Sequence, residues 1–150
     1  PEELNYDDYS KKEVLDMLLI HDMAEAKIGD QVLNLNEPYK ELREQNVIMR
    51  KLMIKGSYPN IANLTYYYNV WTGYYNGTNT NSKIARDINL IQSVYTFCEY
   101  FAKSPEKFTM GDKRKWISEK GKLETDIGYA IFEKLVEKNL DFSRVFDEMI

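Results

Sequence analysis

The chain contains a single histidine and a single cysteine. One cysteine excludes an internal disulfide framework and is typical of proteins from a reducing compartment. That residue, Cys98, falls in step with the apolar residues Ile88 and Ile91, so we expect it in the core. No apolar run is as long as a membrane-spanning helix requires, and the segment beginning at Pro1 has no signal-peptide pattern. We therefore expect a cytoplasmic protein without a membrane partner.

Clustered basic residues are also scarce. The net charge is −4, and the only basic run is Lys113-Arg114-Lys115, which we interpret as a solvated loop or helix start. A nucleic-acid surface needs Lys and Arg gathered against the phosphate backbone, so we expect no nucleic-acid partner. An acidic protein can still bind a mononucleotide if a metal ion supplies the positive charge.

The seven glycines and four prolines mostly separate segments in which apolar residues recur at helical spacing. Hydrophobic residues make up 43% of the 150 residues and charged residues 29%, which is ordinary for a globular domain. We assign residues 1–150 to one all-α domain. The expected helices cover residues 12–27, 37–55, 61–74, 83–101, 113–119 and 124–139, followed by an amphipathic turn or short helix over 142–150.

The only histidine, His21, is followed directly by Asp22 inside the run LLIHDMAEAKIGD, residues 18–30. Burying ionisable groups is costly unless they are paired or bind a metal. On a helix over residues 12–27, Glu25 lies four residues after His21 and three after Asp22, so the three side chains share one edge. A mixed nitrogen and oxygen set suits Mn, Fe, Co, Ni or Zn better than Ca. A buried histidine hydrogen-bonded to its neighbours is the alternative interpretation.

The whole segment resembles the HD-domain metal-dependent phosphohydrolases, and more narrowly their 5′-deoxynucleotidase branch. The motif of that branch runs HD-x-A-E-x-x-x-G-D, and its fixed letters fall on His21, Asp22, Ala24, Glu25, Gly29 and Asp30. The resemblance continues in the Trp-x-x-Tyr spacing of Trp71 and Tyr74 and in the pair Glu99-Tyr100. It implies an HD-domain-like helical bundle. The family's first metal histidine lies upstream of the HD, so we expect this chain to lack the first one or two helices.

The resemblance also implies a function. A divalent metal ion (Mn, Co, Fe, Zn or Mg) would be held by His21, Asp22 and Asn89. Glu25 would orient or deprotonate the attacking water, and Asp30 would position the water, the leaving group or the sugar. The expected substrate is a nucleoside 5′-monophosphate or a similar small phosphate ester.

One position departs from the family pattern. Counting back from Glu99-Tyr100, the last metal aspartate of the family falls on Asn89, whose amide oxygen carries no charge. Asp87 lies two residues earlier, which is about 200° around a helix, so it cannot simply replace Asn89. This departure favours a second hypothesis, in which the chain is a degenerate HD domain that serves as a binding or scaffolding module, with a homodimer as one form of it. The acids Glu25 and Asp30 favour the enzyme.

Twelve tyrosines are present, five of them between residues 66 and 75. We interpret them mainly as amphipathic rings packed at a surface or a dimer interface. The alternative is that some line a nucleobase pocket, since aromatic faces stack on bases.

Overall fold

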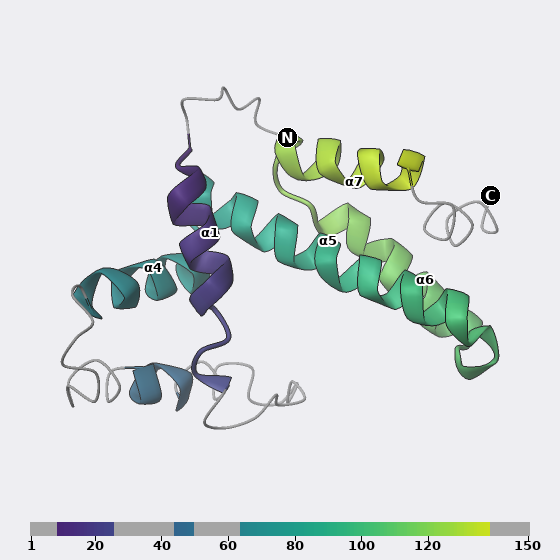
Figure 1. Cartoon of the computed structure of the whole chain (residues 1–150), viewed down its shortest axis with the longest axis horizontal. Coiled ribbons are helices and arrows are strands. Elements are labelled where there is room, and N and C mark those ends of the chain that lie inside the picture. Colours follow the sequence, from purple (N-terminus) through teal and green to yellow (C-terminus); the bar gives the residue numbers. More distant parts are fainter. Residues whose placement is uncertain (1–8, 26–43, 50–63, 139–150) are drawn as a thin grey trace. The chain divides into compact units, whose positions relative to one another are not determined.

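The computed structural model describes residues 9–25, 44–49 and 64–138, and every regular element of these residues is a helix (Figure 1). The expected all-α fold is therefore confirmed. Chain contacts divide it into two compact units, one spanning residues 10–82 and the other residues 83–150 together with 1–9. The assignment of one domain to residues 1–150 stays a prediction. The helices are α1 (Lys11–Ile20), α4 (Leu64–Asn76), α5 (Thr80–Lys103), α6 (Met110–Ser118) and α7 (Asp126–Lys138), with a helical stretch at 44–49.

In the first unit α1 packs against α4. The hydroxyl of Ser10 caps α1 by accepting the Glu13 N–H at 3.3 Å. The buried face of α1 consists of Val14, Met17 and Ile20, at 4%, 0% and 5% exposure. Gly73 permits the close approach of α4, because a Cβ there would lie 3.2 Å from Met17 Cε.

The predicted helix over residues 12–27 is wrong at its end. The α-helix stops at Ile20, and residues 21–24 form a turn in which Met23 N–H donates to the Ile20 carbonyl at 3.0 Å and Glu25 N–H to the Asp22 carbonyl at 2.9 Å. The helical spacing of apolar residues in this segment places Leu19 with Leu15 and Leu18 on the face expected to pack, and this is wrong for Leu19, which is 79% exposed. Apolar residues occur all around this segment, so their spacing alone did not identify the side that packs.

In the second unit α5 and α7 share a core. Its buried members are Ile91, Val94, Phe97, Cys98, Leu123 and Phe132. The predicted core position of Cys98 is confirmed, and burial raises the pKa of its thiol to about 12. Two short 3-10 turns, Pro105–Lys107 and Glu119–Lys122, flank α6.

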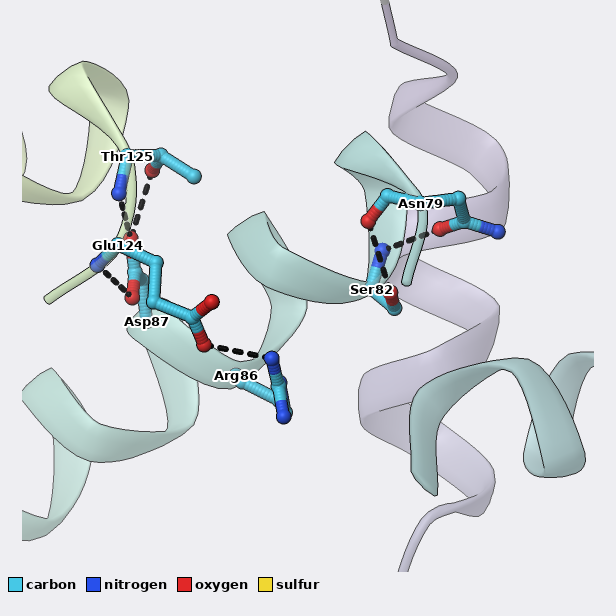
Figure 2. Close-up of polar contacts among 6 residues, drawn as sticks. All are labelled: Asn79, Ser82, Arg86, Asp87, Glu124 and Thr125. Carbon is cyan, nitrogen blue, oxygen red and sulfur yellow. Dashed lines mark hydrogen bonds and ion pairs between the residues drawn. The ribbon is translucent and has the colours of Figure 1, made fainter. Parts of the chain in front are cut away.

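Asp87 fixes the start of α7. One carboxylate oxygen accepts the Glu124 N–H at 2.9 Å, and the other accepts both the N–H and the hydroxyl of Thr125, at 2.9 and 2.6 Å (Figure 2). The Thr125 hydroxyl oxygen in turn accepts the Gly128 N–H at 3.0 Å, as a helix N-cap does. Asp87 is 2% exposed, so a buried carboxylate with three donors defines where α7 begins.

Four predicted helices agree with observed ones, with ends that differ by a few residues. These are residues 61–74 with α4, 83–101 with α5, 113–119 with α6 and 124–139 with α7. The predicted segments at 37–43, 50–55 and 142–150 lie outside the described residues. Among the helices that the structure describes, none is both long and apolar enough to cross a bilayer.

Candidate metal centre

His21 occupies the C-terminal cap of α1. Its backbone is still helical (φ −56°, ψ −39°), and its N–H donates to the Met17 carbonyl at 3.0 Å. The imidazole folds back so that Nδ1 lies 2.8 Å from the Leu18 carbonyl oxygen. Because a carbonyl can only accept, Nδ1 must carry the hydrogen. In the neutral ring the lone pair is therefore on Nε2, and a hydrogen bond from the other ring nitrogen to a backbone carbonyl usually orients a metal-binding histidine.

The Nε2 atom of His21 lies 3.0 Å from the Oδ2 atom of Asp22. In the neutral ring both atoms are acceptors, so the contact is favourable only when a cation, either a proton or a metal ion, lies between them. One ring nitrogen and one carboxylate oxygen this close together can both bind the same divalent ion. The His21 side chain is 13% exposed and that of Asp22 is 59% exposed, so the pair opens toward solvent on the carboxylate side.

The helix itself adds to the attraction for a cation. The end of an α-helix carries about half a negative charge, from carbonyl groups without an intrahelical partner. The last turn of α1 has no basic residue to offset that charge. The electrostatic potential of α1 thus favours a positive ion at the position of His21 and Asp22.

Side chains of α4 hold His21 from the other side. Its main-chain carbonyl accepts two hydrogen bonds at 3.1 Å, from the Trp71 indole N–H and from the Tyr75 hydroxyl. The Tyr74 ring lies against the imidazole with 5.0 Å between ring centroids. These contacts were not predicted, although the Trp-x-x-Tyr spacing was a signal for them. Tyr74 and Tyr75 pack on the histidine, whereas the sequence suggested a surface, an interface or a base pocket.

The other predicted site residues are placed as follows. Glu25 is half-buried and helical, directly after the turn of residues 21–24, and its N–H donates to the Asp22 carbonyl. Asn89 is half-buried on α5 in the second unit, where its main-chain carbonyl accepts the Ser93 hydroxyl at 3.1 Å. Asp30 lies outside the described residues. Within the described ranges 9–25, 44–49 and 64–138, no group of three or more His, Cys, Asp or Glu residues could hold a metal ion. The ligand set His21, Asp22 and Asn89 stays a prediction.

Asp87 is not available as a substitute for Asn89. Both of its carboxylate oxygens are used by donors from Glu124 and Thr125 (Figure 2). The neighbouring Arg86 pairs with Glu124 at 2.5 Å, which further ties this part of α5 to the chain before α7. The expectation that Asp87 cannot take over the metal position therefore has a structural reason.

Comparison with known proteins gave one match. A family model described as an HD domain matches residues 3–128, which is more than half of the chain. Neither the curated proteins nor the solved structures gave a match.

Proposed function

The chain belongs to the HD-domain family, and on this basis we propose that it is a metal-dependent phosphohydrolase acting on nucleoside 5′-monophosphates or related small phosphate esters. The observation that carries the proposal is the His21–Asp22 pair. Its Nε2 and Oδ2 atoms lie 3.0 Å apart, and the Leu18 carbonyl fixes the tautomer that leaves Nε2 able to bind a cation. Such a pair at the end of α1, whose dipole favours positive charge, supports a metal centre.

In this proposal His21, Asp22 and Asn89 would hold a divalent ion. When bound, the ion would supply positive charge to polarise a phosphoryl oxygen and acidify water. Glu25 accepts a proton from the water that attacks phosphorus, a role suited to a carboxylate one turn beyond the ligands. Asp30 positions the water, the leaving group or the sugar. Phosphate monoesters hydrolyse extremely slowly without a catalyst, so a defect in this set should abolish turnover.

The test combines metal analysis with phosphate release. The protein is loaded with Mn²⁺, Co²⁺ or Mg²⁺ and offered a panel of deoxynucleoside monophosphates. We expect stoichiometric metal, turnover in the wild type, and a loss of at least about 100-fold in Glu25→Ala with the metal retained. Glu133→Ala, at an exposed position on α7, is the matched control and should keep full activity. A wild-type protein that takes up no metal and releases no phosphate would contradict the proposal.

A second function is a binding or scaffolding module without catalysis. The neutral amide of Asn89, at the position where the resemblance places an aspartate, favours it, because an uncharged ligand weakens the hold on a divalent ion. Nucleotides that raise the melting temperature without being hydrolysed, in the presence of each metal, would support this function over the first.

A further inference from the structure

The carbonyl groups at the end of α1 have unusual partners. An α-helix leaves its last carbonyls without intrahelical donors, and these must be satisfied in another way. Here the Leu18 carbonyl accepts the His21 ring at 2.8 Å, and the Ile20 carbonyl accepts the Met23 N–H at 3.0 Å. The His21 carbonyl accepts the Trp71 indole and the Tyr75 hydroxyl, each at 3.1 Å. Both the ring and the main chain of His21 are therefore held by hydrogen bonds.

The two donors to the His21 carbonyl form one unit. Trp71 and Tyr75 are one helical turn apart on α4, and their ring centroids are 4.7 Å apart. Trp71 is 0% exposed, so its indole N–H needs an acceptor inside the protein, and the His21 carbonyl is that acceptor. Tyr75 adds a second donor to the same oxygen from a half-buried position. The main chain of His21 is consequently fixed to α4 at a single atom.

This attachment bears on the direction of the imidazole. With the carbonyl held by α4, the Cα–Cβ bond of His21 keeps its direction relative to the Leu18 carbonyl, and Nδ1 can reach that carbonyl at 2.8 Å. The opposite nitrogen then faces Asp22 at 3.0 Å. The Tyr74 ring limits rotation of the imidazole from the side. If the carbonyl were released, the ring could turn and the pairing of Nε2 with Asp22 would become one of several arrangements.

We propose that Trp71 and Tyr75 are positioning residues of the metal centre, which act through the His21 carbonyl and do not touch the ion or the substrate. This inference rests on the proposed function, because the orientation of His21 affects metal affinity only if His21 binds the metal ion. The positioning itself is a property of the chain without metal. A purely structural role for Tyr75 would lower stability alone and would leave the imidazole tautomer unchanged.

The single histidine makes the test direct, because every imidazole nitrogen signal in a ¹⁵N NMR spectrum belongs to His21. Tyr75→Phe removes the hydroxyl and keeps the ring against Trp71. Tyr67→Phe is the matched control on the same helix, since the Tyr67 ring contacts Tyr66. We expect Tyr75→Phe to move the imidazole signals from the Nδ1–H tautomer toward a mixture. We also expect Mn²⁺ binding about fivefold weaker, the effect of one neutral hydrogen bond, and no change of either quantity in Tyr67→Phe.

The outcomes separate the two proposals. Imidazole signals in Tyr75→Phe that match those of the wild type overturn the positioning, whatever the metal affinity. A wild type that binds no Mn²⁺ contradicts the proposed function, while the imidazole signals still decide whether Tyr75 positions the ring. Circular dichroism and the melting temperature establish that each variant is folded. Should Tyr75→Phe fail to fold, Trp71→Phe removes the other donor to the same carbonyl and the same signals are compared.

Discussion

The Thr125 hydroxyl donates to the buried Asp87 carboxylate at 2.6 Å, and this pair joins α5 to the start of α7. Replacing Asp87 with alanine would leave the hydroxyl and two backbone N–H groups without their acceptor. We expect the free energy of unfolding to fall by about 3 kcal/mol, measured by urea denaturation. Asp112→Ala is the control, since Asp112 accepts from the Thr109 N–H and hydroxyl at an exposed site. Equal decreases in the free energy of unfolding in the two variants would show that burial of the Asp87 carboxylate does not raise the cost of removing it.

Gly128 lies where α7 begins to pass over Asp87. A Cβ at this position would lie 2.8 Å from the Asp87 Cβ, which is closer than two carbon atoms can approach. Gly128→Ala should therefore destabilise the protein by about 1–3 kcal/mol, although alanine is the better helix former. Gly121→Ala is the matched control, because a Cβ there would meet nothing within 4 Å. A melting temperature of Gly128→Ala equal to that of the control would show that α7 can move away from Asp87 and accommodate the added methyl group without a loss of stability.

The pH dependence of stability should show the contribution of Asp16. Hydrogen bonds from Lys12, at 2.6 Å, and from Tyr66, at 2.7 Å, hold the pKa of this carboxyl below its ordinary value of 3.8. A lowered carboxyl pKa stabilises the fold above the ordinary pKa, and the stabilisation is lost as the pH falls through the lowered value. Tyr66→Phe removes one of the two donors, so it should be less stable than the wild type at neutral pH, and this difference should shrink as the pH falls below 3.8.

The measurement is the difference in unfolding midpoint between wild type and Tyr66→Phe at several pH values. Tyr129→Phe, in the second unit, serves as the control and should show a constant difference from the wild type. If the difference in unfolding midpoint between the wild type and Tyr66→Phe grew as the pH fell, the proposed contribution of Asp16 would be contradicted.

Asn89→Asp tests the predicted third ligand. An aspartate would add a negative charge to the proposed ion shell, and affinity for divalent ions rises with the number of charged ligands. We expect Mn²⁺ to bind about tenfold more tightly, as measured by calorimetry. Gln92→Glu, at an exposed position on the same helix, is the control for added charge. Equal affinities in the wild type and Asn89→Asp would remove residue 89 from the ligand set.

The sequence predicted the helical class and the extent of α5 and α7, and it identified the adjacent residues His21 and Asp22 as candidate metal ligands, which stays a prediction. These features depend on local periodicity or on adjacent residues. The contacts that hold the candidate centre could not be predicted, because their partners are distant in the chain. Tyr75 and His21 are 54 residues apart, and Thr125 and Asp87 are 38 apart. Contacts between residues this far apart in the chain leave no periodic pattern in the sequence.

The end of α1 was predicted wrongly for a related reason. Hydrophobic spacing describes which face of a helix can pack, but it carries no information about which group donates a hydrogen bond to each backbone carbonyl. The Leu18 carbonyl accepts its hydrogen bond from the imidazole of His21, three residues later. A side chain that competes with the backbone in this way shortens a helix without changing its apolar pattern.

The Leu18 carbonyl accepts the His21 imidazole in the candidate centre, and the same oxygen would be needed by the backbone if α1 were longer. A longer helix α1 and an assembled centre therefore disfavour each other. In a longer helix that carbonyl would be the acceptor for the backbone N–H of residue 22. Conditions that favour helix extension, such as added alcohol or a helix-promoting substitution in the turn, would add this backbone donor to the same oxygen and weaken its hydrogen bond to the histidine. Cosolvents that increase total helicity should accordingly weaken the centre, and a bound cation should resist them by keeping α1 short.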